Sequence, residues 1–293
     1  MKTNVIVNET ISIYNDISYE IDDIFMEYAM ESENESVDDN ENKENFAKRL
    51  LGTVTKLINE IYAIIDRFVN HVRNVLYRVA QTDVGFRDNC RQAMKDNKPY
   101  EAVKLIVYNY NDQYLESQVN KITRECTSIL TSMNRDYQIK DDESDGDALD
   151  MKKKDIVKYI LIKIGCPSNV TDMNMYFELI KKNFRVEKKE MLFKASLGNV
   201  YYNKALEIEN IKKVTHDRQT VMKNQAATIK SELMNIVENN TTQDHVKKRA
   251  VRYYRHAAGV YNFYTAFLKV YIQFKIEETL MYRAVLKKLF HFQ

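Results

Sequence analysis

The sequence predicts an all-α protein, built from long amphipathic helices in a helical-bundle arrangement. Only six glycines and two prolines occur in 293 residues. These residues punctuate turns and strands, so a chain with so few of them favours long helices with few connections. Hydrophobic residues make up 44% of the chain, which is enough to form a buried core.

Charge is strongly segregated along the chain. Residues 1–45 carry 13 acidic and 2 basic side chains, whereas residues 151–293 carry 13 acidic and 27 basic side chains. A short segment, 139–150, has 6 acidic side chains and 1 basic one. We therefore divide the chain into an acidic leader and disordered linker (1–45), an N-terminal helical domain (46–138), an acidic linker (139–151) and a basic C-terminal helical domain (152–293).

In the leader, apolar residues recur at helical spacing from Tyr14 to Tyr28, before the acidic linker. The first long helix is expected at 46–81, where Leu50, Val54, Leu57 and Ile61 begin a seam of about eight turns. A stop at 83–85, a short helix at 86–96 and a helix at 112–137 follow. Each is predicted from the spacing of its apolar residues.

Residues 102–110 (AVKLIVYNY) are the best strand candidate in the chain. Val103, Leu105 and Val107 alternate with other residues, and the segment is rich in β-branched and aromatic side chains. A single strand is not stable alone, so we expect either a minor β element here or a stiff segment packed on helices.

After the second linker we expect a helix at 155–164, ended by Gly165 and Pro167. Ser168 or Thr171 could cap the next helix. Residues 187–240 read as one or two long charged helices, and 239–242 as a loop. The last helix has the most regular pattern, a heptad-like aromatic seam typical of a coiled coil, in which Tyr264, Phe267, Tyr271 and Phe274 continue a 3,4 spacing that starts at Ala250.

No pattern of catalytic, cofactor-binding or metal-binding residues stands out, and we expect the protein not to be an enzyme. Glycine-rich phosphate loops and the zinc-protease spacing of histidines are both lacking in the sequence. The three cysteines, Cys90, Cys126 and Cys166, have no CxxC spacing, which is typical of free thiols in a reducing compartment. A cysteine or histidine nucleophile stays open only as a third alternative.

Two kinds of partner fit the C-terminal region. Its aromatic seam could be covered by a core or by a partner helix, giving an oligomer through the C-terminal helix. Alternatively, its bases and rings could bind nucleic acid, because bases neutralise phosphates and rings stack on nucleobases. The candidate interface or anion-binding residues are Lys247, Lys248, Arg249, Arg252, Arg255, Tyr264, Phe267, Tyr271 and Phe274.

Three stretches carry a resemblance to internal or structural virion proteins of large tailed bacteriophages of Gram-positive hosts. They are ISIYNDISYEIDDIFMEYAMESE in the leader, the basic helix from Phe46 followed by KPYEAVKLIVYNYND, and KKDIVKYILIKIGCPSNVTDMNMYFELIKKNFRVEKKE. The resemblance implies a helical structural protein of the capsid, located in the virion and the host cytoplasm. Its partners would then be other virion proteins or itself, with DNA as a further partner.

The resemblance also implies proteolytic processing of the leader. Prohead proteases of such particles cut after a small-x-Glu tripeptide, and Ala29, Met30 and Glu31 fit that pattern. The same pattern recurs at Ala205–Glu207, so the tripeptide alone is a weak signal. Cleavage after Glu31 would remove an acidic arm that could otherwise dock on the basic body.

Overall fold

A computed structural model describes residues 42–82, 85–139 and 153–292. These residues form helices and one two-stranded antiparallel sheet, which confirms the predicted mostly helical fold with a minor β element. The helices are α2 (Asn42–Thr82), α3 (Phe86–Asp96), α4 (Asp112–Ile139), α5 (Lys153–Lys163), α6 (Met173–Phe184), α7 (Gly198–Ala205), α8 (Ile208–Glu238), α9 (Asp244–Tyr254) and α10 (His256–Phe290). The strands are β1 (Ala102–Tyr110) and β2 (Arg185–Lys194), and β2 leads into a short 3-10 turn, Ala195–Leu197.

Most helices begin and end close to where the apolar spacing placed them. The prediction of 86–96 agrees with α3, and the seam of α2 is buried from Leu50 to Val79. Asp172, and not Ser168 or Thr171, caps α6, because its Oδ1 accepts a hydrogen bond from the Met175 amide at 2.9 Å. The predicted leader helix and both acidic linkers lie almost entirely outside the described residues.

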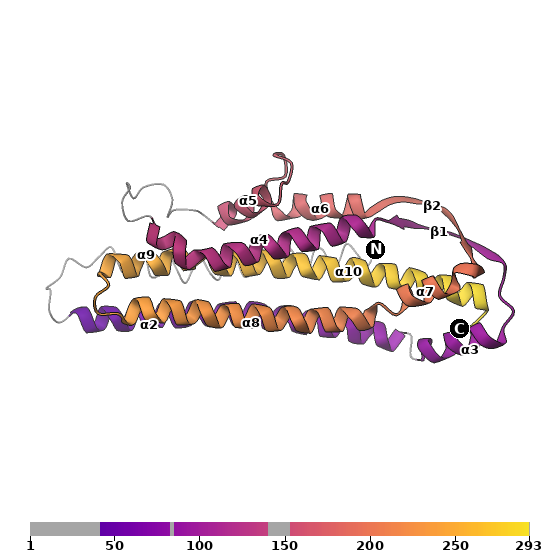
Figure 1. Ribbon diagram of the computed structural model, residues 1–293, viewed down its shortest axis with the longest axis horizontal. Helices are drawn as coiled ribbons and strands as arrows, with labels where there is room; N and C mark the ends of the chain where they lie inside the picture. Colours follow the sequence, from indigo (N-terminus) through magenta and orange to yellow (C-terminus); the bar gives the residue numbers. More distant parts are fainter. Residues whose placement is uncertain (1–41, 83–84, 140–152, 293) are drawn as a thin grey trace. The chain divides into compact units, whose positions relative to one another are not determined.

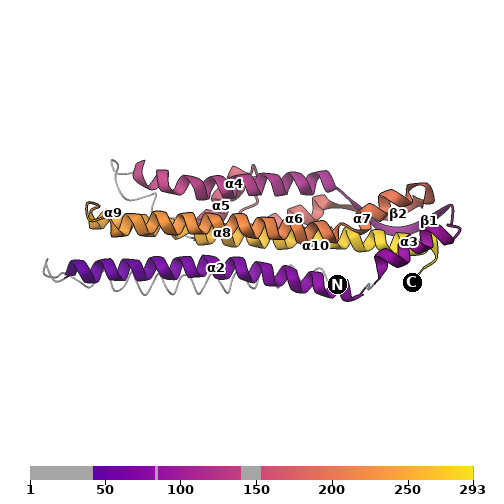
Figure 2. The ribbon, with the colours of Figure 1, turned by 60° about the horizontal axis from the view of Figure 1, so that its bottom comes forward.

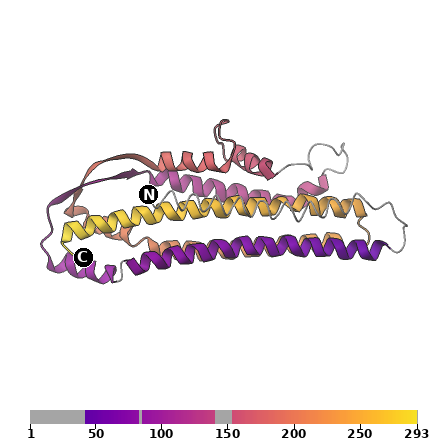
Figure 3. The ribbon, with the colours of Figure 1, turned by 180° about the vertical axis from the view of Figure 1, so that it is seen from behind.

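The prediction of a helix from residue 187 onward is wrong at its start, because β2 occupies 185–194. β2 pairs antiparallel with β1, with Ile106 opposite Glu190 and Val103 opposite Phe193. β1 itself has the predicted bounds, and its missing partner lies about 80 residues later in the chain. Figures 1 and 3 show the two strands running beside each other.

The described residues divide into two compact units, and each is made of three separate stretches of chain. The first unit contains the described residues up to Arg67, Lys121–Tyr176 and Thr220–Phe267, and the second contains Phe68–Asn120, Phe177–Gln219 and Leu268–Gln293. Both units take residues from either side of the acidic linker, so the two domains drawn from the sequence do not coincide with them.

The core of the first unit forms around the first three turns of α10. Tyr176 of α6 stacks near Phe263 and Phe267, with ring centroids 6.1 and 6.2 Å away. Tyr261 donates a hydrogen bond to the Met222 carbonyl of α8 at 3.2 Å. Gly259 lets α5 approach closely, since a Cβ built at this position would lie 2.8 Å from Ile156 Cγ2.

In the second unit, the ribbon formed by β1 and β2 covers one side of a core with α3, α7 and the last turns of α10 (Figures 1 and 2). Phe193 is buried there, and Val103, Leu105, Val107 and Met191 pack against the same cluster. The opposite face of the ribbon faces outward and leaves Ile106 70% exposed. The ribbon is therefore amphipathic, with one face packed and the other open.

No helix among the described residues is both long enough and apolar enough to cross a membrane.

Candidate functional site

The four aromatic residues proposed as an interface lie in the cores of the units. Phe267 and Phe274 are fully buried, and Tyr264 and Tyr271 are nearly so. Tyr264 shares a hydrogen bond with Thr123 at 3.2 Å. The aromatic seam is thus covered by helices of the chain itself.

The five candidate bases do not form one open surface. Lys247 is buried and Lys248 is half-buried, with its ammonium 5.1 Å from the centre of the Phe46 ring. Arg249 and Arg255 are also half-buried, and the side chain of Arg252 lies outside the described part of the structure. The processing tripeptide Ala29, Met30 and Glu31 lies outside the described residues as well.

The strongest concentration of charge is a buried ionic cluster in the second unit, centred on Lys275 of α10. Its ammonium lies 3.0 Å from Glu278, 3.1 Å from Asp112 of α4 and 3.2 Å from Glu207, which precedes α8. Lys204 of α7 forms ion pairs with Asp112 and, at 3.3 Å, with Glu278. These pairs link α4, α7 and α10 through the Lys275 cluster, by which we mean these five residues.

The cluster is sealed from solvent at its centre. The side chains of Lys275 and Glu278 are 2% and 3% exposed, whereas Asp112 and Lys204 are 30% and 34% exposed. A buried charge is stable only when it is paired, so each member here depends on the others.

The carboxylates of the cluster divide into two kinds. Burial raises the pKa of Glu278 to about 7. A hydrogen bond with Asp112 adds to this rise, and the charge of Lys275 opposes it. Burial would also raise the pKa of Asp112, but hydrogen bonds with Lys204 and Glu278 and the charge of Lys275 lower it. Burial alone would lower the pKa of Lys275, and the surrounding carboxylates reverse that direction. Asp112 and Lys275 therefore stay charged, while Glu278 titrates near neutral pH.

A second ion pair, partly buried, holds β2 to α10 within the same unit. Arg185 pairs with Glu277, which also accepts a hydrogen bond from the Tyr110 hydroxyl at 2.9 Å. Beside it, the Phe184 ring stacks between Tyr110 and Phe274, with centroids 4.9 and 5.0 Å away. This contact fixes the end of the ribbon where β1 enters α4.

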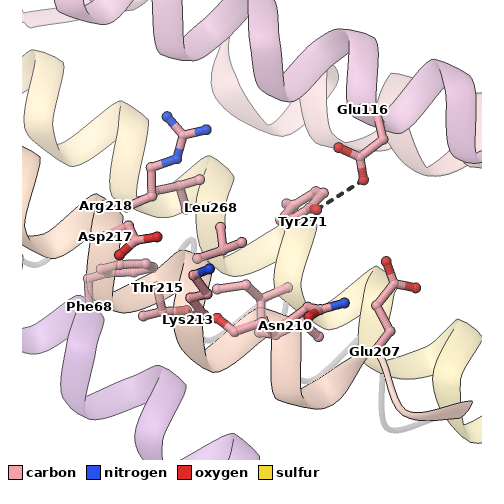
Figure 4. A pocket seen from close by; sticks show the side chains of 13 residues that line it. Phe68, Glu116, Glu207, Asn210, Lys213, Thr215, Asp217, Arg218, Leu268 and Tyr271 are labelled. Atoms are coloured by element: carbon pink, nitrogen blue, oxygen red, sulfur yellow. Dashed lines mark hydrogen bonds between the residues drawn. The ribbon is translucent and has the colours of Figure 1, made fainter. Parts of the chain in front are cut away.

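A pocket of about 490 Å³ adjoins the Lys275 cluster (Figure 4). Glu116 and Glu207 lie at one end, where the Tyr271 hydroxyl donates a hydrogen bond to Glu116 at 3.0 Å. Asp217 and Arg218 lie at the other end. The remaining lining residues are Phe68, Asn210, Ile211, Lys213, Val214, Thr215, Leu268 and Ile272.

The acidic end of this pocket has the chemistry to hold an organic cation. Glu207 Oε2 is buried and has no hydrogen-bond partner among the described residues. However, the ammonium of Lys275 already lies 3.2 Å from Glu207 and 4.0 Å from Glu116. The chain therefore supplies its own cation at this position.

Two of the three cysteines lie where their thiols are held protonated. Cys90 and Cys126 are buried, and burial raises the pKa of Cys126 above its ordinary value. Burial also raises the pKa of Cys166 to about 11, against the opposing charge of Lys121. A thiol acts as a nucleophile in its deprotonated form, so both environments disfavour catalysis. Within the described residues, no three His, Cys, Asp or Glu side chains are grouped to hold a metal ion.

The Lys275 cluster was missed because the sequence places Lys269 and Lys275 on the polar faces of the last helix. Both are buried, at 6% and 2% exposure. A signal was available, since Lys275 and Glu278 are charged residues three positions apart in a largely apolar segment and so share a helical face. The partners on α4 and α7 are far away in sequence, and no local pattern points to them.

Comparison with known proteins gives no relative, since no family model, curated protein or solved structure matches this chain.

Proposed function

We propose that this chain is a non-enzymatic structural protein that acts through contacts with other protein chains, as an internal or structural component of a virion. One observation carries the non-enzymatic part. The charged groups best placed for acid–base chemistry, Lys275, Glu278 and Asp112, are paired with one another, and Lys275 and Glu278 are closed off at the centre of the cluster. A reacting substrate needs an accessible group, and this cluster instead ties helices together.

The virion role is supported by the resemblance of the three sequence stretches and by the segregation of charge. Proteomics of purified phage particles tests it directly. We expect the chain in the particle at a constant ratio to the major capsid protein, with an N-terminal peptide that begins at Ser32 if the leader is removed after Glu31. Particles that lack the chain would contradict the proposal, whereas an intact leader would contradict only the processing step.

Nucleic-acid binding is the alternative function, and the excess of bases in residues 151–293 favours it. The burial of Tyr264, Phe267, Tyr271 and Phe274 removes the rings that were expected to stack on nucleobases. Any affinity would then come from phosphate contacts alone, which weaken steeply with salt. A gel shift of double-stranded DNA between 50 and about 200 mM salt separates the two functions. A complex that vanishes with salt supports the alternative, and no complex at low salt excludes it.

Thiol labelling tests the remaining enzymatic alternative. We expect iodoacetamide to label the folded chain slowly at pH 7, because the pKa of Cys166 is raised to about 11 and that of Cys126 is raised by burial. Labelling in urea serves as the control for full reactivity. Fast labelling of one thiol in the folded protein would revive the idea of a cysteine nucleophile.

A further inference from the structure

The outer edge of β1 is open for a further strand. Along β1, the backbone pairs with β2 on one side only, and the sheet has two strands in the described part of the chain. The nearest other backbone bonds flank the strand. The Ala195 amide donates to the Glu101 carbonyl, the Tyr100 amide to Leu289 and the Asn111 amide to Phe184. An open edge presents a row of unused amides and carbonyls that can pair with another strand.

The two strands of the ribbon differ in how well their edges are protected. β2 carries Glu187, Lys188, Lys189 and Glu190 in a row, and charged side chains are a common device against edge pairing. In β1, Lys104 is the single charged residue among nine. The outward face of β1 also holds Ile106, which is 70% exposed. The edge of β1 is therefore the one that lacks protection.

We propose that β1 pairs with β1 of a second copy of this chain, antiparallel and centred on Ile106, to form a four-stranded sheet across a two-fold axis. The inference rests on the proposed role in protein–protein contacts, and it names the partner as a second copy. A two-fold axis at the middle residue of the strand brings all nine residues of β1 into register.

This register is self-complementary. Ile106 meets Ile106 of the other copy. Lys104 meets Tyr108 and not a second lysine, and its charge is already balanced by Glu190 of β2 at 3.0 Å. On the inner face, Leu105 meets Val107, which extends the packed side of the ribbon. Apolar and mixed pairs of this kind stabilise a sheet, whereas like charges directly opposite destabilise it.

The same operation on β2 gives the opposite result. A two-fold pairing centred on any residue from 187 to 190 places a charged side chain opposite itself, as with Lys189 against Lys189. Each of these registers of β2 therefore contains a like-charge pair on the axis, although an axis at Lys189 also sets Lys188 opposite Glu190, whereas the register of β1 contains no like-charge pair. This difference in charge between the two strands is the reason that we propose pairing through the edge of β1, with β1 of a second copy.

Sedimentation velocity on the full chain tests the association. We expect the wild-type protein to approach twice the 34.6 kDa chain mass as its concentration rises through the micromolar range. Ile106→Lys places two ammonium groups opposite each other, and we expect it to weaken association at least about tenfold. Ile162→Lys is the matched control, because Ile162 on α5 is similarly exposed, at 65%, and lies outside the ribbon.

Disulfide trapping tests the register. Both variants carry Cys166→Ser, since the other two cysteines are buried. Ile106→Cys places two Cβ atoms about 4.5–5.5 Å apart across the axis, close to the range in which a disulfide forms. Leu192→Cys is the control, because Leu192 lies on the same face but on β2. It would be about 20 Å from its copy, since the two residues are separated by three strand spacings across the sheet and by four residues along it.

We expect a covalent dimer on a non-reducing gel for the variant at 106 and none for the variant at 192. The inference is overturned if the wild-type chain stays monomeric, if Ile106→Lys associates as well as Ile162→Lys, or if the two cysteine variants cross-link equally. Circular dichroism checks that each variant is folded. We expect each to fold, because Ile106, Ile162 and Leu192 are all exposed. A monomeric chain that is nevertheless present in particles would remove this inference and leave the proposed function standing.

Discussion

Replacement of Lys275 by Met should cause a large loss of stability. The substitution keeps the aliphatic bulk of the side chain and removes an ammonium that lies within 3.2 Å of Glu278, Asp112 and Glu207. Among the described residues of the cluster, Lys204 then remains to pair with Asp112 and Glu278. Removing one partner of a buried ion pair costs about 3–5 kcal/mol, because the other charge stays buried without compensation. The expected loss is a large share of the 5–15 kcal/mol by which a typical domain is stable, on the order of a third.

Urea unfolding at pH 7, followed by circular dichroism, measures this loss. Lys223→Met is the matched control, since Lys223 pairs with Asp66 at 2.9 Å but both side chains are well exposed, at 40% and 54%. An exposed pair of this kind contributes at most about 1 kcal/mol. The double variant with Glu207→Gln should recover part of the loss, because it removes a carboxylate whose cation partner in the described structure is Lys275.

Equal small losses for Lys275→Met and Lys223→Met would refute this reasoning. Such a result would mean that water reaches the Lys275 cluster and screens its charges. A loss of more than 3 kcal/mol with no recovery in the double variant would place the effect in the packing of the side chain instead of its charge.

Three further predictions concern pH and packing. The pKa of Glu278 is raised from 4.5 to about 7. Its contribution to stability is therefore complete below pH 4.5 and is lost as the pH rises through 7. Urea unfolding across this range should show that Glu278→Gln removes this fall in the free energy of unfolding. Burial, with the charges of Lys269 and Arg78, lowers the pKa of His71 from 6.5 to about 4. The contribution of His71 to stability is therefore complete above pH 6.5 and falls toward pH 4. His71→Gln should make the free energy of unfolding less dependent on pH between 6.5 and 4, and an unchanged dependence would contradict the lowered pKa. Gly259→Ala should lower stability by about 1–3 kcal/mol, because the added Cβ overpacks the contact with Ile156. Gly52→Ala has open space at its Cβ and should raise stability by up to about 1 kcal/mol. Thermal unfolding that ranks the two variants in the reverse order would contradict the close contact at Gly259.

Local patterns predict most of this fold. The seams of α2 and α4 and the bounds of α3 follow from apolar spacing, because each helix buries one face. The bounds of β1 follow from its alternation and its β-branched residues.

β2 could not be found in this way. Its sequence, RVEKKEMLFK, is mostly charged, and only Met191 and Phe193 on its inner face point to a strand. Its extended conformation is fixed by hydrogen bonds to β1, which precedes it by about 80 residues. Pairing between distant segments leaves little trace in the local sequence of either one.

The ionic cluster escapes prediction for a related reason. A helix that is covered on all sides loses the polar face that usually marks the solvent side, and α10 is buried along most of its length. Lys275 therefore has the appearance of a surface base in the sequence. Its carboxylate partners come from segments before α8 and from α4, so their convergence depends on the tertiary fold.

The position of α10 in the chain bears on how the protein comes to be folded. This helix follows every segment that it packs with, from Thr123 and Met222 in the first unit to Asp112 in the second. During synthesis, the apolar surfaces that face α10 therefore stay uncovered until this last helix has emerged from the ribosome. Exposed apolar surface promotes aggregation, so the nascent chain is most exposed to that risk before α10 has emerged.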